Sequence, residues 1–380
     1  MRRRIIALAF LAIAALVAVT SATARTDADA GADRYIVVLK PGADARAVAN
    51  EHAAAHAAAI AFVYSHALNG YAATIPNARL AAIQADERVA YVEPDGEMNA
   101  VAQTVPYGIA KIGADVSSTR AGDGAGAVSN VNAYIIDTGI DATHADLNVV
   151  GHVNFAGGPN RDCNGHGTHV AGTVAAEDNA SDVVGIAPGA PLTGVKVLGC
   201  GGSGSNSGVI AGIDWVTANA VKPAVANMSL GGSVSQAVDD AVRRSAASGV
   251  FYALAAGNDG ADACGHSPAR AGAGTNNGIM TVAATDSADR EASWSNDGSC
   301  VDIWAPGVSI LSTRKGGGTT TMSGTSMASP HGAGGGALYL STHTGSSPSS
   351  VESALRSAAQ TPGTKSKDGR SIVREYVGGF

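Results

Sequence analysis

The chain has 380 residues, a length that predicts two or three structural units rather than one. Charged residues make up only 15% of it and glycine occurs 49 times, which favours a large, well-packed enzyme domain over a disordered chain. The formal net charge of −7 is mild, and Lys and Arg are scattered beyond the first residues. The composition therefore argues, though weakly, against nucleic-acid binding.

Residues 1–24 have the pattern of a secretory signal peptide. Three arginines, Arg2 to Arg4, precede an apolar stretch over 5–19, and small residues over 22–24 suit a cleavage site. The alternative is a membrane anchor, but the stretch is short for a span and no later segment is long and apolar enough. We expect export, removal of this leader, and a polar spacer over 25–33.

Residues 34–97 alternate between strand-like and helix-like patterns, which predicts a small α+β unit. The helix over 77–86 is expected to be capped by Asn77. The expected strands are 35–39, 70–75 and 89–93, and the expected helices are 43–61 and 77–86.

From Ala102 onward, short apolar runs alternate with helical stretches, which predicts an α/β domain with a mostly parallel sheet and helices on both faces. Catalytic groups of such folds gather at the carboxyl ends of strands, where Asp137 and Asn258 fall. The expected strands are 131–136, 192–198, 224–229, 250–255 and 279–283, and the expected helices are 166–176, 208–220, 236–248 and 326–342.

An acid, a base and a nucleophile each lie next to glycine in three short motifs. Asp137 ends an apolar strand, His166 lies in Asn-Gly-His-Gly-Thr-His, and Ser326 lies in Gly-Thr-Ser-Met-Ala-Ser-Pro-His. A serine hydroxyl is a poor nucleophile unless an imidazole takes its proton and a carboxylate orients that imidazole. The three side chains together predict acyl-transfer chemistry.

Other readings of these residues are possible. Asp137 in Asp-Thr-Gly could belong to an aspartic peptidase, but that chemistry needs a second such carboxylate and the sequence has none. His166 and His169 could be metal ligands one helical turn apart, but His-Glu-x-x-His is absent. Taken alone, Asp137 could form a simple turn at a strand end, and His169 reads best as structural.

The chain order and the residues of the three motifs resemble those of the subtilisin family of secreted serine endopeptidases. The resemblance implies a doubly wound, mostly parallel sheet preceded by a small α+β, ferredoxin-like propeptide domain. It assigns Asp137, His166 and Ser326 to the catalytic triad and the Asn258 amide to the oxyanion. One departure follows Ser326, where Gly332, Gly334, Gly335 and Gly336 weaken the expected helix. This pattern indicates a helix that is either loosely held or closely packed.

Two glycine-rich stretches and one strand end resemble the family's substrate cleft. Extended backbone there lets a peptide add as a strand, which favours broad specificity. The alternative is two ordinary loops. The expected substrate-binding residues are Gly202, Ser203, Gly204, Ser229, Leu230, Gly231, Ala256 and Gly257.

The four cysteines contain no Cys-x-x-Cys pair, so they fit no zinc pattern, and an exported chain permits disulfides. Three pairings are possible, and four buried thiols are the alternative. Similar bridges in thermostable members of the family imply the sequential pairing, Cys163–Cys200 and Cys264–Cys300.

The acidic segment after the His166 helix resembles the calcium loop of bacterial subtilisins, although it could also be a solvated loop. The implied ion is structural, and no catalytic cofactor is expected. Gln103 is expected to reach the loop only after the propeptide is removed. A second, weaker ion is implied near Asp302. The ligands implied for the first, structural ion are all oxygen donors that suit Ca²⁺, namely Gln103, Asp146, Glu177, Asn179, Ser181 and Val183.

Residues 102–109 resemble the mature start of bacterial subtilisins, which implies cleavage between Val101 and Ala102, or one bond earlier. The domains are then a propeptide over 34–101, serving as folding aid and inhibitor, and a catalytic domain over 102–380. We expect an extracellular monomer that acts on proteins and peptides and has no nucleic-acid or membrane partner after the leader is removed. An inactive or inhibitor-locked binding protein of the same fold is the alternative.

Overall fold

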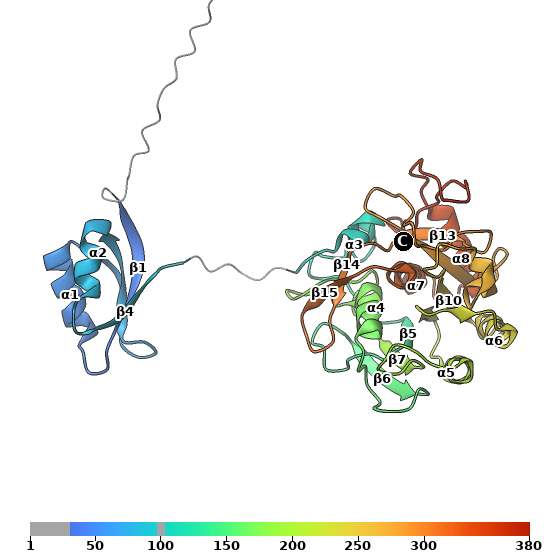
Figure 1. The fold of residues 1–380 in the computed structure, drawn as a ribbon, viewed down its shortest axis with the longest axis horizontal. Coiled ribbons are helices and arrows are strands. Elements are labelled where there is room, and N and C mark those ends of the chain that lie inside the picture. The colour runs from blue at the N-terminus through green and yellow to red at the C-terminus, as the bar shows by residue number, and fades with distance from the viewer. Residues whose placement is uncertain (1–30, 97–102) are drawn as a thin grey trace, which may run out of the picture. The chain divides into compact units, whose positions relative to one another are not determined.

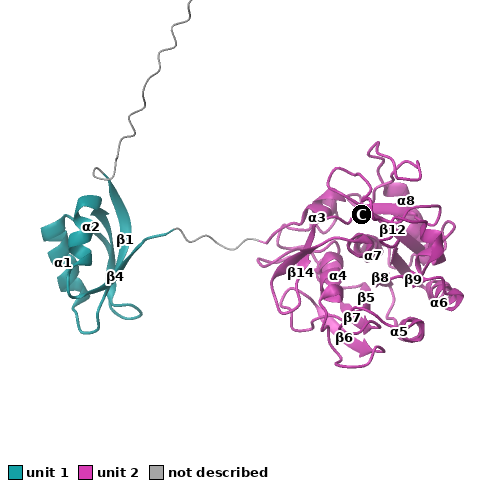
Figure 2. Ribbon diagram, viewed as in Figure 1, with its two compact units in different colours: residues 1–100 teal, residues 101–380 magenta. Residues whose placement is uncertain are grey.

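The computed structural model describes residues 31–96 and 103–380 (Figure 1). The expected signal peptide, the spacer before Gly31 and the Val101–Ala102 cleavage site lie outside the described residues. The chain divides into two compact units, Met1–Ala100 and Val101–Phe380 (Figure 2). Each unit has its own core and is considered by itself.

The described part of the first unit is an antiparallel sheet in the order β2-β3-β1-β4 with two helices. Val37, Tyr71 and Ile75 of the sheet pack against Val48 and Ile83 of the helices. This arrangement confirms the small α+β unit. The elements are β1 (Ala32–Leu39), α1 (Ala45–His56), β2 (Ala59–Tyr64), β3 (Gly70–Pro76), α2 (Asn77–Gln84) and β4 (Val89–Pro94).

Two details of this unit differ from the sequence-based expectation. The Asp44 carboxylate caps α1, and Ala57, at φ 55°, ends the helix in the left-handed conformation. The Ala-rich stretch then continues as β2, which pairs with β3, so the helix expected over 43–61 is too long. Asn77 is the first helical residue of α2 rather than its cap, and Pro76 precedes it without a side-chain hydrogen bond.

The described part of the second unit contains a parallel sheet in the order β13-β12-β10-β8-β5-β7-β6. The five expected strands are present, and β6 and β13 extend the sheet at its two edges. The strands are β5 (Asn132–Asp137), β6 (Val149–Asn154), β7 (Leu192–Lys196), β8 (Ala224–Met228), β10 (Val250–Ala255), β12 (Ile279–Thr285) and β13 (Ile303–Pro306).

Helices cover both faces of this sheet, because successive strand residues point to opposite sides. On β5, Ile135 belongs to the core shared with α4, α7 and α8, whereas Ile136 belongs to the core shared with α5 and α6. The doubly wound α/β architecture is thereby confirmed. The helices are α3 (Tyr107–Lys111), α4 (His166–Ala175), α5 (Asn206–Asn219), α6 (Gln236–Ala247), α7 (Thr325–Thr342) and α8 (Pro348–Ala358).

Smaller elements complete the unit. Two antiparallel pairs lie outside the main sheet: β9 (Gly232–Ser233) with β11 (His266–Ser267), and β14 (Ile310–Thr313) with β15 (Thr319–Met322). Short 3₁₀ helices are η2 (Ala114–Val116), η3 (Ala263–Gly265) and η4 (Ala269–Gly272). No helix in the described parts of the chain is both long and apolar enough to cross a membrane.

The glycines of α7 are sites of close packing. A Cβ atom at Gly334 would lie 2.7 Å from Cβ of Ile186, and one at Gly336 would lie 2.6 Å from the ring of Phe251. The helix is almost wholly buried between β8, β10, β12 and α4. Of the two sequence-based readings, close packing is therefore correct, and the low helix propensity of glycine is offset by tertiary contacts.

Both disulfides have the expected pairing, Cys163–Cys200 and Cys264–Cys300. The first joins the loop before α4 to the segment that follows β7. The second joins η3 to the segment that precedes β13.

Candidate active site

Asp137 is the last residue of β5, and the buried position of that strand in the sheet makes its carboxylate wholly buried. Its Oδ1 lies 2.7 Å from Nδ1 of His166 and also accepts a 2.7 Å hydrogen bond from the N–H of Thr138. Its Oδ2 has no hydrogen-bond partner among the described residues. The end of β5 thus holds a fixed carboxylate next to Nδ1 of the His166 imidazole.

His166 opens α4, immediately after Gly165, whose φ of 111° permits the sharp entry into the helix. The His166 side chain is 26% exposed, so one edge of the ring faces Asp137 and the other remains accessible. The negative charge of Asp137 raises the pKa of His166 above its usual value, while burial opposes the shift. A hydrogen bond from Nδ1 to Asp137 leaves Nε2 as the nitrogen that can accept a proton.

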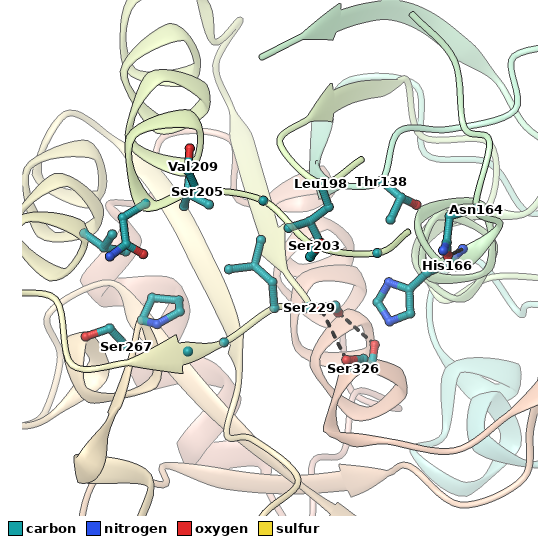
Figure 3. Close-up of a pocket in the computed structure, with 18 residues that line it drawn as sticks. Thr138, Asn164, His166, Leu198, Ser203, Ser205, Val209, Ser229, Ser267 and Ser326 are labelled. Atoms are coloured by element: carbon teal, nitrogen blue, oxygen red, sulfur yellow. Dashed lines mark hydrogen bonds between the residues drawn. The ribbon is translucent and has the colours of Figure 1, made fainter. Parts of the chain in front are cut away.

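Ser326 is the second residue of α7 and faces the same pocket as His166 (Figure 3). Its hydroxyl donates to the carbonyl of Ser229 at 3.2 Å, and the Ser229 hydroxyl donates to the Ser326 carbonyl at 2.8 Å. The first N–H groups of a helix lack intrahelical acceptors, so the Ser326 N–H is available to an anion at this position.

Asn258 lies just beyond the end of β10 and contacts the start of the same helix. Its Oδ1 accepts hydrogen bonds from the N–H and the hydroxyl of Thr325, both at 2.9 Å. Because its oxygen is held in this way, the two N–H donors of the Asn258 amide are free of Thr325, and Asn258 lines a hollow together with Ala256 and Gly257. The side chain is oriented to donate rather than to accept.

The predicted cleft residues surround these groups. A pocket of about 410 Å³ is lined by His166, Ser326 and six of the predicted substrate-binding residues, Gly202, Ser203, Gly204, Ser229, Leu230 and Gly231 (Figure 3). The remaining two, Ala256 and Gly257, line an adjoining hollow of about 520 Å³ with Asn258. Gly231 and Gly232 line both spaces, so the two hollows are neighbours. All eight residues therefore line one of the two hollows that also contain the candidate catalytic side chains His166, Ser326 and Asn258.

Comparisons with known proteins agree with this geometry. Residues 129–378 match the family model described as the subtilase family. The chain belongs to the subtilase family. Residues 34–100 match a second model, described as peptidase inhibitor I9, over the range of the first unit. This subtilase is thus a serine protease preceded by an inhibitor-type propeptide domain.

Curated relatives support the same assignment. The extracellular serine proteinase of a Thermus strain is 46% identical over 81% of this chain and 75% of its own length. Subtilisin DY of Bacillus licheniformis is 45% identical over 72% of this chain and 97% of its own length. The crystal structure of a cold adapted subtilisin-like serine proteinase is 41% identical, with a TM-score of 0.63, over 72% of this chain and 97% of that one.

Several residues at the site were not singled out from the sequence. Thr138, Asn164 and Leu198 line the pocket beside the predicted residues. Asp162 and Lys196 are buried next to them. The available signal for Asp162 is its position four residues before His166, just ahead of the motif that begins at Asn164. The other side chains come to the site only through the fold, from strand ends and from the glycine-rich segment after β7.

The segment over 177–183, which the resemblance assigned to calcium binding, places oxygen atoms around one amide. Nε2 of Gln103 lies 2.6 Å from the carbonyl oxygen of Glu177, 3.1 Å from that of Ser181, 3.0 Å from that of Val183 and 3.5 Å from Oδ1 of Asn179. An amide nitrogen has two hydrogens and cannot satisfy four acceptors. Its Oε1 is buried without a partner among the described residues. The O and N of an amide have nearly the same shape, and a half-turn of the Gln103 amide would place five oxygens together.

The sixth predicted ligand, Asp146, lies at the edge of this group. It is buried, its Oδ1 accepts from the Asn179 amide at 2.7 Å, and its Oδ2 accepts from the Val183 N–H at 3.2 Å. Burial is the main reason that the pKa of Asp146 rises to about 6. The donor set fits a hard cation. Gln103 already contacts the loop in the intact chain, contrary to the expectation that cleavage must first release it.

Asp302, by contrast, does not fit a second cation. Its Oδ2 accepts a 2.6 Å hydrogen bond from the Thr281 N–H, and the guanidinium of Arg356 contacts its Oδ1. Nε of Arg356 also donates to the buried carboxylate of Glu352 at 2.9 Å. A positive group is therefore already bound to Asp302, and the weaker ion that the resemblance implied does not fit there.

His169 is wholly buried on α4, and its Nε2 lies 3.0 Å from the carbonyl oxygen of Ile310. Burial lowers the pKa of His169 to about 4, so the ring is neutral and donates to that carbonyl. His169 thus packs α4 against β14. The alternative in which it shares a metal with His166 is not supported.

Proposed function

We propose that this subtilase hydrolyses peptide bonds with Ser326 as nucleophile, His166 as general base and Asp137 as the group that orients the imidazole. The observation that carries the proposal is the 2.7 Å contact from Asp137 to Nδ1 of His166, with the other edge of the ring facing the pocket that Ser326 lines. This is the arrangement that converts a neutral hydroxyl into a nucleophile.

The reaction begins when the Ser326 hydroxyl turns from the Ser229 carbonyl to Nε2 of His166. As Oγ bonds to the scissile carbonyl carbon, the proton passes to Nε2, and the Asp137 carboxylate stabilises the imidazolium. His166 then gives the proton to the leaving amine, which departs and leaves an acyl group on Ser326. Water, deprotonated by His166, cleaves this ester and restores the hydroxyl.

The developing oxyanion needs donors that are in place before the reaction. The Asn258 amide, held by Thr325, and the Ser326 N–H at the start of α7 are the two proposed donors. Preorganised donors of this kind stabilise the transition state more than the ground state, because the charge appears only there.

The substrate is proposed to be an extended segment of protein or peptide. Backbone from 202–204 and 229–231 flanks the pocket, and a chain laid between them could pair as an added strand. Main-chain pairing does not depend on side-chain identity, which supports broad specificity.

We further infer that the chain is made as a secreted precursor. Its relatives include extracellular proteinases, and its first residues have the pattern of a leader. The unit over 34–101 would inhibit the catalytic domain over 102–380 until cleavage between Val101 and Ala102. One Ca²⁺ ion held by Gln103, Asp146 and the 177–183 loop would stabilise the mature domain.

Replacement of the nucleophile tests the proposal. Ser326→Ala should reduce turnover by roughly 10⁶-fold, to the residual given by binding and oxyanion stabilisation. Its precursor should stay uncleaved, whereas N-terminal sequencing of the parent should begin at Ala102 or Val101. A serine-directed sulfonyl fluoride should label the purified parent and not the variant. Activity above a few per cent in Ser326→Ala contradicts the assignment, and an unlabelled parent favours the inactive binding protein.

A further inference from the structure

One buried carboxylate outside the proposed triad accepts more hydrogen bonds than any triad residue. Asp162 is 3% exposed. Its Oδ1 accepts from the Thr138 hydroxyl at 3.0 Å and from the N–H groups of Asn164 and Gly165 at 2.9 and 2.8 Å. Its Oδ2 accepts from the N–H and the hydroxyl of Thr168 at 3.0 and 2.6 Å. Five donors from the surrounding chain therefore satisfy both oxygens of this buried carboxylate.

These donors come from the two elements that carry the proposed base and its orienting group. Thr138 directly follows Asp137 at the end of β5, and its hydroxyl also accepts from the Gly167 N–H at 2.9 Å. Thr168 belongs to the first turn of α4, which His166 opens. Asp162 therefore connects the strand end to the helix start, and the Asp137–His166 contact spans the same gap.

The charge of Asp162 acts on the same imidazole. The pKa of His166 is raised chiefly by Asp137, and the negative charge of Asp162 adds to the rise. A buried positive group, Lys196 on β7, interacts with the charges of Asp162 and Asp137, and its Nζ donates to the carbonyls of Thr138 and Leu198 at 2.7 and 2.9 Å. The ionisable groups around His166 are thus Asp137, Asp162, Lys196, His169 on its own helix, and Lys315, whose Nζ donates to the Cys163 carbonyl.

We propose that Asp162 is a positioning residue for the hydrolytic reaction, which aligns Asp137 with His166 and, by its charge, makes His166 a stronger base. The inference rests on the proposed function, because it assumes that His166 is the base. Asp162 acts through His166 and touches no substrate. If the proposal is correct, removing its charge must change the pH dependence of the reaction and not only the stability of the protein.

The test is the pH dependence of kcat/KM for the mature Asp162→Asn variant on a peptide substrate. Loss of a negative charge disfavours the imidazolium, so the pKa of His166 should fall and the acidic limb should move to lower pH by roughly half a pH unit. Titration of the His166 imidazole by NMR in the absence of substrate should show the same shift. Asp286→Asn is the matched control, since Asp286 also accepts turn N–H groups, from Ala288 and Arg290, and should leave the limb unchanged.

A second variant separates alignment from charge and does not depend on the folding of Asp162→Asn. Thr138→Val removes the shared hydroxyl but keeps every charge, so kcat should fall roughly tenfold with the acidic limb of the pH profile unchanged. Coinciding pH profiles of parent and Asp162→Asn, or a Thr138→Val variant with parental kcat, overturn the proposal. Failure of the proposed function itself would appear separately, as activity that survives in Ser326→Ala.

Discussion

At the residue scale, the site depends on polar side chains that are held by a second polar group. Asp137 is fixed by the Thr138 N–H, and Asn258 by Thr325, before any substrate arrives. Each of these hydrogen bonds costs little at the moment of reaction, because the donor or acceptor need not reorient. Single substitutions at such positions should therefore affect turnover more than binding.

Asn258→Ala is expected to lower kcat by about 10²–10³-fold, with little change in KM, because its N–H donates mainly to the transition state. Steady-state kinetics on a peptide substrate measure both values. Asn296→Ala offers no control, because Asn296 supports the same loop. Asn130→Ala, whose amide donates to the Ser341 carbonyl, is a suitable one. A raised KM with parental kcat contradicts the role of Asn258.

Glu375 is wholly buried against α7, and neither carboxylate oxygen has a partner among the described residues. Burial raises the pKa of Glu375 to about 8, so the folded state keeps a proton that the unfolded state loses above about pH 4.5. Stability contributed by the protonated carboxyl is complete below that pH and is lost as pH rises through about 8. Glu375→Gln has no such proton to lose.

The expected result is a pH-dependent stabilisation. Inhibited mature Glu375→Gln should melt roughly 5 °C above the parent at pH 9, and the difference should be smallest near pH 4.5. Thermal melts at the two pH values measure it. A gap of the same size at both pH values would mean that packing, and not ionisation, separates the variants.

At the element scale, α7 shows how tertiary contacts override local propensity. A helix with four glycines in five positions would be weak alone, but each small residue lets a strand or another helix approach closely. The same argument explains why Gly334 and Gly336 have no space for a larger residue. The element that carries Ser326 is therefore rigid because it is crowded.

The two disulfides offer a comparison between elements. Their sequence separations are 37 and 36 residues, so the loop-closure model assigns roughly 4 kcal/mol of stability to each. Only the first tethers the loop that holds Asp162 and leads into the His166 helix. Cys163→Ser with Cys200→Ser should therefore lose kcat at temperatures where both double variants remain folded.

The matched control is Cys264→Ser with Cys300→Ser, which should lower the melting temperature by a similar amount and keep parental kcat. Circular dichroism melts and kinetics at 25 °C separate the two effects. Equal loss of kcat in both double variants would show that the first disulfide has no special relation to the site.

At the scale of the whole molecule, one seven-stranded sheet brings together groups that are distant in the chain. Its order places β5 between β7 and β8, so the carboxyl ends of these strands, and of β10 beside β8, meet at one edge. Three of these strands end at or just before Asp137, Ser229 and Asn258. The first residues of helices α4 and α7 contribute His166 and Ser326. Open α/β sheets bind ligands at this edge for the same reason.

Calcium is expected to stabilise the catalytic domain as a whole, because an ion that binds only the native state shifts the unfolding equilibrium. Inhibited mature enzyme should melt several degrees lower in chelator than in excess Ca²⁺. Asp146→Asn should remove most of this difference. Asp302→Asn should lower both melting temperatures equally, because Asp302 is bound by Arg356. Coinciding curves for the parent with calcium and with chelator would eliminate the ion.

Local patterns in the sequence are enough to predict the fold class, the small α+β unit, the central strands and the motifs that contain Asp137, His166 and Ser326. Short segments of the sequence carry these signals, as apolar runs, polar residues next to glycine and the spacing of motifs. The pairing of cysteines followed from family resemblance. Edge strands β6 and β13 are harder to predict, because β6 is only partly buried and β13, although apolar, has just four residues and ends in proline.

The tertiary structure alone decided which polar groups meet. Arg356 lies 54 residues after Asp302 and forms an ion pair with it, so Asp302 is not the metal ligand that the sequence suggested. Asp162 connects β5 to α4 only because the fold brings these two elements together. The glycines of α7 are needed because Ile186 and Phe251 pack directly against them. Contacts between distant segments depend on the three-dimensional path of the chain, which no local pattern of residues records.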